Sequence, residues 1–337
     1  MSSTQNNDQL FREFLKNYGN PEEKEIREKL QNPIVKPGVY KMRSRLELEV
    51  PETWKKELMD RVKLKSLMLK ELKSRTSTSD RIVQPTLVGE PSSKVVTSKG
   101  GEKITVIEDQ YSQIIVPKEM KKFIAEDIDE AAKTDLNEYL LDTLSTEIAS
   151  YIDRETVSDS QDDKSAMQSI ITSNQVAIRE SKGMSTVAGY IVMDEALADA
   201  FVAARKHLPN GYSTKAKWIM NSATFDKLKT MKITPTEEFP TDSPVTTDGN
   251  GVANEILGKP VIVNEHMPST GIIAILADLS RGYIFAAPTD MSLIIGSDSS
   301  TYLEVAALKT YMGGQVLQPA CFKLVKLDNV AEVVPND

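Results

Sequence analysis

The side chains that could hold a metal ion or act as a nucleophile are few and scattered. The chain of 337 residues has two histidines, His207 and His266, and a single cysteine, Cys321. A zinc site needs three or four ligands at recognisable spacing, and neither histidine has a cluster of Cys, Asp or Glu near it. His207 follows a helical segment, His266 belongs to a loop, and Cys321 stands in a strand-like apolar run where a small core residue is expected. We therefore predict no metal site and no catalytic cysteine.

Glycine-containing segments match nucleotide-binding or catalytic loops only in part. Gly258-Lys259 is followed by Pro260 where a phosphate-binding loop requires Ser or Thr, and no glycine stands five residues earlier. Residues 183–185 and 313–314 match neither a nucleophile elbow nor a dinucleotide loop. Residues 248–251 have too few acids in register for a calcium loop. The sequence thus predicts no catalytic residue, no cofactor-binding residue and no cofactor, so that the chain is not an enzyme.

Composition and charge indicate a globular protein with two unlike parts. Apolar residues make up 40% and charged residues 27%, and no apolar run approaches the ~18 residues that span a bilayer. The N-terminal residues lack the features of a secretory signal, and a single cysteine fits a reducing cytosol. Residues 1–82 contain 18 Lys and Arg against 13 Asp and Glu, which leaves 23 of the 41 basic and 36 of the 49 acidic residues for the remainder. A basic arm on an acidic body suggests an arm that lies on nucleic acid or on a neighbouring copy, and we favour the second.

Two helices are predicted in the N-terminal part, around residues 10–15 and over 52–72. In the second, Trp54, Leu58 and Val62 recur at helical spacing, and lysines and arginines surround this apolar stripe. Such a helix could bind a membrane surface, a nucleic acid or the groove of a partner. We favour a helix that packs on protein, within the chain or on a neighbouring copy.

A polar hinge at residues 74–80 leads into a predicted extended β-hairpin. Its arms are expected at 81–88 and 104–107, with a turn at 98–101. The longest predicted helix begins at Pro117, because proline is favoured at the first helical position. Its apolar face continues to Ile152, roughly nine turns later, which predicts a structural spine.

The second half of the chain predicts an α/β insert followed by strands. A helix is expected at 193–207, a strand at 217–220, and a helix at 223–231 that a preceding Asn or Ser caps. Residues 232–256 predict a loop, and strands continue from there to the end of the chain. Strands that return to the long helix make an α+β fold with a discontinuous domain.

The last 80 residues or so carry a recognisable order of strands and turns. They include Leu257-Gly258-Lys259-Pro260-Val261, Met267-Pro268, the apolar runs 272–278 and 282–285, and the long run from Tyr302 to Val316. This order resembles the C-terminal half of the major capsid proteins of tailed double-stranded-DNA bacteriophages, which have the Hong Kong 97 fold. The hairpin, the helix from Pro117 and the strand at 218–221 with its capped helix extend the resemblance over roughly residues 80–330.

The resemblance implies a domain division and a function. An N-terminal arm is expected at 1–80, an extended β-hairpin loop at 81–112, a discontinuous peripheral domain with the spine helix at 113–188 and 284–337, and an axial domain at 189–283. The implied function is self-assembly of hexamers and pentamers into an icosahedral virion shell, built in the host bacterial cytoplasm without a membrane. The shell would enclose double-stranded DNA without sequence-specific binding, and scaffolding, portal and decoration proteins are the implied further partners.

The residues expected at subunit contacts lie in the hairpin, in a loop near the threefold contact and on the basic helix. They are Lys94, Lys99, Gly100, Gly101, Asp298, Ser299, Ser300, Lys55, Arg61 and Lys65. Some family members join subunits by an isopeptide bond between a hairpin lysine and an asparagine, helped by a glutamate. Lys94 or Lys99 could supply the amine, but the matching strand around Glu304 has no asparagine. We therefore expect a shell held by non-covalent contacts.

Other function classes stay open on the sequence alone. An encapsulin-like compartment shell shares the implied fold and differs in enclosing an enzyme instead of DNA. An α+β enzyme whose site has no local motif is a further alternative. A DNA-binding protein that uses the basic residues 52–75 is another, although the acidic body argues against it.

Overall fold

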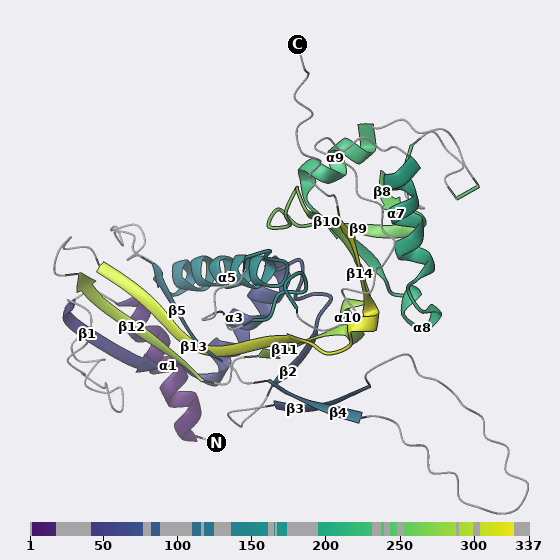
Figure 1. Ribbon diagram of the computed structural model, residues 1–337. Coiled ribbons are helices and arrows are strands. Elements are labelled where there is room, and N and C mark those ends of the chain that lie inside the picture. The colour runs from purple at the N-terminus through teal and green to yellow at the C-terminus, as the bar shows by residue number, and fades with distance from the viewer. Residues whose placement is uncertain are drawn as a thin grey trace, which may run out of the picture.

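The computed structural model describes most of the chain, and the fold is given for that part. The described residues are 2–17, 42–76, 82–87, 110–115, 118–124, 136–160, 165, 167–173, 195–230, 237–238, 243–247, 253–287, 290–298 and 304–326. They form two six-stranded sheets, a separate two-stranded ribbon, and helices that pack on the sheets (Figure 1). The fold is therefore α+β, as predicted.

The first sheet is built around one long strand. Its members are β1 (Met42–Glu49), β2 (Lys73–Thr76), β5 (Lys118–Ile124), β11 (Tyr283–Ala287), β12 (Met291–Asp298) and β13 (Glu304–Val316). β11 and β12 follow one another along β13 and pair antiparallel with it. β5 lies on the opposite edge of β13, because residues 306–310 pair both with β5 and with β12. β1 lies outside β12 and β2 outside β11, so that the N-terminal part of the chain borders its C-terminal part.

The second sheet has the strand order β14-β10-β6-β9-β8-β7. Its strands are β6 (Lys217–Met220), β7 (Val245–Thr247), β8 (Ala253–Ile256), β9 (Lys259–Val263), β10 (Ile272–Ala277) and β14 (Phe322–Lys326). Only β6 and β9 pair in parallel. Leu257 and Gly258 join β8 to β9 with φ of 52° and 67°. A two-residue hairpin turn of this kind requires positive φ at both positions, and glycine adopts it without strain.

The helices and the ribbon complete the fold. The helices are α1 (Ser2–Lys16), α3 (Glu52–Lys65), α5 (Leu136–Glu155), α7 (Glu195–Lys206), α8 (Asn210–Ser213), α9 (Ser222–Thr230) and α10 (Leu279–Gly282), with a 3-10 turn η1 (Pro319–Cys321). The ribbon pairs β3 (Ile82–Leu87) with β4 (Gln110–Ile115) and lies on the side of the first sheet away from α5 (Figure 1). Among the described residues, no helix is long and apolar enough to cross a membrane.

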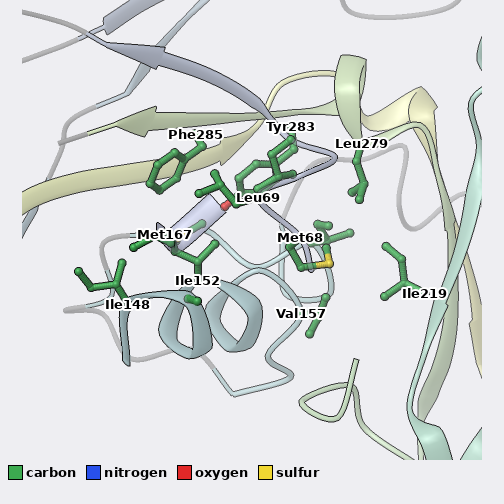
Figure 2. Close-up of a cluster of buried hydrophobic side chains, with 14 of the residues drawn as sticks. Met68, Leu69, Ile148, Ile152, Val157, Met167, Ile219, Leu279, Tyr283 and Phe285 are labelled. Carbon is green, nitrogen blue, oxygen red and sulfur yellow. The ribbon is translucent and has the colours of Figure 1, made fainter. Parts of the chain in front are cut away.

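A single apolar core joins the two sheets. Trp54, Leu58 and Val62 of α3 are buried in it together with one face of α5. On the second sheet, the Phe201 ring of α7 packs 4.8 Å from the Trp218 ring of β6, centroid to centroid. Figure 2 shows Met68 between Val157 and Leu279, on the side of the cluster nearest Ile219 of β6. The first sheet with α1, α3 and α5 is called the first lobe here, and the second sheet with α7, α8 and α9 the second lobe. Because one core spans both sheets, the two lobes pack as one unit.

Two crossings of the chain between the lobes lie in the described part, and they are hydrogen-bonded to each other. α10 connects β10 to β11, and η1 connects β13 to β14. The Leu317 amide donates to the Gly282 carbonyl at 2.7 Å, and the Asp278 amide donates to the Cys321 carbonyl at 3.2 Å. A Cβ at Gly282 would lie 2.5 Å from the Phe322 ring, so that close backbone approach requires glycine here.

Much of the predicted order of elements is confirmed. Helices occur at α1, α7 and α9, strand β6 covers residues 217–220, and strands follow from β9 to β14. The Asn221 side chain caps α9, since its Oδ1 accepts the Ala223 amide at 2.8 Å. The strand predicted at 81–88 is β3, and its partner β4 begins at Gln110; residues 104–107 lie outside the described part.

The predicted spine helix is too long at its start. Residues 118–124 form strand β5, and α5 covers only Leu136–Glu155. The apolar residues of this segment fit a helical face, but its seven residues pair with β13, which stands far away in the sequence. A local pattern cannot show such a partner, and tertiary pairing overrides helical spacing.

Three further predictions were wrong at element ends. The helix predicted over 52–72 stops at Lys65, because Ser66 is extended (φ −72°, ψ 131°) and residues 67–71 form turns. The polar hinge at 74–80 begins with strand β2, which pairs in parallel with β11. The loop predicted over 232–256 contains β7 and β8, which pair with each other. In each case the backbone forms hydrogen bonds with a group that the local sequence pattern does not reveal: Asp153 for the turn after α3, β11 for β2, and β7 and β8 for each other.

The segment predicted as an N-terminal arm is part of the first lobe where the structure describes it. Phe11, Phe14 and Leu15 are at most 1% exposed. β1 and β2 supply two strands of the first sheet. The domain boundaries that the resemblance implied stay predictions.

Candidate functional site

The cysteine is held in an environment that suppresses thiolate chemistry. Cys321 lies at the end of η1, buried and without a disulfide partner. Burial raises the pKa of its thiol to about 12, with a further contribution from the nearby Asp278 carboxylate. A nucleophilic cysteine needs a lowered pKa and access to solvent, so Cys321 acts as a core residue.

The histidines and acids do not converge on a metal site within the described part of the chain. His207 follows α7, and its Nδ1 lies 2.7 Å from the Ala203 carbonyl, which keeps the ring at the helix end. His266 is an exposed turn residue whose Nε2 lies 3.4 Å from the Ser150 hydroxyl. The contacts of the two histidines are therefore local ones, and the two rings do not face a common metal position.

The glycine pair 313–314 serves packing in β13. A Cβ at Gly314 would lie 2.5 Å from the Tyr283 hydroxyl oxygen and 2.9 Å from the Met167 Cε. The Tyr283 hydroxyl donates to the Gln168 carbonyl at 2.7 Å, and the Gln168 amide donates to the Gly314 carbonyl at 2.8 Å. Burial raises the pKa of Tyr283, so the hydroxyl stays a protonated donor. Glycine is thus required by the close approach of the segment that carries Met167 and Gln168.

The basic residues of α3 find acidic partners on the same chain. Arg61 donates to the Glu138 carboxylate of α5 from Nη1 at 2.6 Å and from Nη2 at 2.8 Å, and Nη2 also donates to Glu57 at 3.1 Å. Lys65 Nζ lies 2.5 Å from the Asp142 carboxylate and 2.7 Å from the Thr146 hydroxyl. These hydrogen bonds raise the pKa of Arg61 and lower the pKa values of Glu138 and Asp142.

The same pattern extends to α1. Arg12 donates to Glu57 at 2.9 Å and pairs with Asp8 at 3.4 Å. Lys55 is only 8% exposed and pairs with Glu52 at 2.7 Å. Four basic residues of the N-terminal part, Arg12, Lys55, Arg61 and Lys65, thus have acidic partners within the subunit.

Most of the predicted subunit-contact residues lie outside the described part of the chain. These are Lys94, Lys99, Gly100, Gly101, Ser299 and Ser300. Asp298 ends β12 and is paired in register with Met42 of β1. Lys55, Arg61 and Lys65 lie on α3 with the intrachain partners given above. The four described residues lie on two elements, β12 and α3, and the role of all ten residues at subunit contacts stays a prediction.

The most constrained polar group is one that sequence reasoning missed. Asp153 of α5 is 7% exposed. Its carboxylate accepts the Ser66 hydroxyl at 2.6 Å and the backbone amides of Leu67 and Met68, each at 2.9 Å. Its backbone carbonyl accepts the Asn264 side-chain amide, at 2.9 Å, from the second lobe. The sequence contains one indication of this role, because Asp153 directly follows Ile152 of the apolar face of the predicted helix.

The comparison with known families assigns the chain to one of them. The sequence model of the phage capsid family matches residues 48–327. The chain belongs to the phage capsid family. No curated protein matches the sequence.

Solved structures from a GTA particle and from phages share the fold. The capsid of an empty GTA particle is 18% identical, with a TM-score of 0.58 over 78% of this chain and 90% of that chain. A structure from Microbacterium phage Oxtober96 is 13% identical, with a TM-score of 0.54 over 78% and 91% of the two chains. One from Mycobacterium phage Adephagia is 14% identical, with a TM-score of 0.51 over 79% and 91%. At these identities the likeness shows a shared fold.

Membership in this family agrees with the lack of a recognisable catalytic site in the described part of the chain. This phage capsid family member is a structural, non-enzymatic protein. Its α1 helix and most of β1 precede the residues that the family matches. The α1 helix thus lies outside the residues that the family model matches.

Proposed function

We propose that this capsid protein assembles with copies of itself into a closed icosahedral shell of hexamers and pentamers that encloses a double-stranded DNA genome. The proposal is carried by the family match over residues 48–327. The subunit would be located in the virion after assembly in the host bacterial cytoplasm. Scaffolding, portal and decoration proteins are the partners that such a shell requires in addition.

The shape of the subunit supports this function. One core spans both lobes, which gives a stiff unit with sheet edges at several sides, among them β1 and β7. The ribbon of β3 and β4 pairs only with itself in the described part, apart from a contact of β4 with β13. A two-stranded ribbon is marginal when isolated, so a neighbouring subunit is its natural support. Many weak contacts of this kind are sufficient when each subunit repeats them around a shell.

We infer non-covalent contacts between the subunits. The strand β13 and the residues before it lack the asparagine that a crosslink would need. Denaturing gels of assembled shells should therefore show one band at the subunit mass of 37.4 kDa. A ladder of multimers on such a gel would overturn this part of the proposal.

Electron microscopy of the expressed full-length chain tests the main proposal. Closed shells of uniform diameter are expected, and light scattering that reports only monomers would contradict them. Particles isolated from infected cells should protect DNA from nuclease. Shells that instead hold one enzyme and no DNA would assign the chain to a cellular compartment.

A further inference from the structure

The turn after α3 presents large apolar side chains to solvent. Leu64, in the last turn of the helix, is 74% exposed, and Leu67, just beyond it, is 42% exposed. Two exposed leucines within four residues are unusual, because Tyr311 is the one other large apolar side chain of the described part with a comparable exposure.

The backbone of the turn at Leu67 is anchored to the core. Ser66 and Met68, on either side of Leu67, are fully buried. The Leu67 amide donates to the buried Asp153 carboxylate, and the Ser66 hydroxyl accepts the Leu69 amide at 2.9 Å. A backbone fixed in this way loses little conformational entropy when a partner covers the turn. The exposure of Leu67 is therefore built into the turn and is not the result of a fraying helix end.

The charges near the two leucines are mostly positive, with the exposed Asp60 one helical turn before Leu64 and Asp142 of α5 paired with Lys65 as the nearby acids. Glu71 is the only acid among residues 63–75, and it pairs with Lys217 of the second lobe at 2.6 Å. Lys63 and Lys70 are exposed and flank the leucines in sequence. The surface thus combines apolar area with positive charge, whereas residues 83–337 carry 36 acids against 23 bases. A basic, partly apolar strip is complementary to an acidic protein surface.

We propose that Leu64 and Leu67, flanked by Lys63 and Lys70, form a contact with the acidic surface of a second copy of this chain. A nucleic acid backbone would satisfy the lysines but would leave the leucines in water, so the leucines favour a protein partner. The inference rests on the proposed assembly into a shell. It deepens that proposal by naming an assembly contact outside the hairpin and the loop at 298–300.

The test compares matched variants of the full-length chain. L64S/L67S removes the apolar contact, and K63E/K70E reverses the charge of the strip. K215E/K227E makes the same charge change at exposed lysines of the second lobe and serves as the control. We expect the lowest protein concentration that gives shells, measured by sedimentation and microscopy, to rise at least about tenfold in the first two variants and to stay unchanged in the control.

The outcomes separate the inference from the proposed function. If wild type and L64S/L67S form shells at the same concentration, this inference is wrong and the proposed function stands. If the wild-type chain stays monomeric, the proposed function fails and the contact fails with it. A lowered unfolding temperature of the isolated L64S/L67S subunit would show that the leucines pack on their own chain. Variant shells that form normally and lose only their DNA would assign the strip to nucleic acid. This result and a lowered unfolding temperature would each overturn the proposal.

Discussion

Individual residues of this subunit are constrained by packing and by buried hydrogen bonds. Asp153 and Gly314 are the clearest cases. The first is a buried acceptor for the turn after α3, and the second leaves room for Tyr283 and Met167. Neither residue has a catalytic role, and both are tested by stability measurements on isolated subunits.

Asp153→Ala should lower the free energy of unfolding by about 3 kcal/mol. The change leaves the Ser66 hydroxyl and two backbone amides without their acceptor in a buried site, which costs more than the loss of an exposed hydrogen bond. Urea denaturation measures the effect. Asp226→Ala on α9, where the carboxylate pairs at the surface with Lys229, is the control and should cost less than about 1 kcal/mol. Equal losses would show that Asp153 does not anchor the turn.

Gly314→Ala should destabilise the subunit by about 1–3 kcal/mol, because the added methyl group overlaps the Tyr283 hydroxyl and forces β13 or the tyrosine to move. Gly211→Ala is the matched control. A Cβ at Gly211 meets nothing within 4 Å, and the residue lies in the short helix α8. It should be neutral or stabilise by up to about 1 kcal/mol. A neutral Gly314→Ala would contradict the packing role of this glycine.

At the scale of elements, the helices α1, α3 and α5 form one charged and apolar assembly. The Phe11 ring packs edge-on against the Trp54 ring, 5.8 Å between centroids, and Arg12, Glu57, Arg61 and Glu138 form a chain of ion pairs beside it. Exposed pairs of this kind add little each, typically ~0.5 kcal/mol. The apolar contact therefore dominates the docking of α1.

Phe11→Ala should release α1 from α3 and expose Trp54. A buried phenylalanine truncated to alanine costs about 3–5 kcal/mol, which is a large share of the docking energy of a short helix. The expected readouts are a red shift of tryptophan emission and faster proteolysis within the first residues. Gln9→Ala, an exposed position on the same helix, should change neither. If Phe11→Ala behaves like this control, α1 does not depend on its apolar face.

The whole molecule consists of two sheets that share one core. Met68, Val157 and Leu279 meet between the lobes, and the Lys217–Glu71 ion pair and the hydrogen bond of Asn264 to Asp153 also cross between them (Figure 2). A subunit built in this way transmits force from one lobe to the other without a soft linker. That property would suit the shell proposed above.

The isolated subunit should unfold in one cooperative transition. Elements that share a core and hydrogen bonds lose stability together, whereas independent domains melt separately. Differential scanning calorimetry of the monomeric subunit is the measurement, and the calorimetric and van't Hoff enthalpies should agree. Two resolved peaks would show that the lobes are independent.

The sequence by itself determined the elements that local chemistry specifies. The strand at 217–220, the Asn221 cap, the helix at 195–206 and the C-terminal strands follow from periodicity, capping and turn residues. The absence of recognisable catalytic patterns and the order of the last strands pointed to the capsid family. These features depend on neighbours within a few residues, so a single sequence contains them.

The tertiary structure decided which distant segments pair and which polar groups are used. Residues 118–124 became β5 and residues 73–76 became β2 because strands at the other end of the chain, β13 and β11, offered hydrogen bonds. Basic residues of α3 bind acids of α5 in the same chain. The Asp153 carboxylate accepts hydrogen bonds from the turn after α3, which lies 85 to 87 residues earlier in the sequence. Such choices depend on contacts between segments that are remote in sequence, and the free energy of those contacts outweighs local preference.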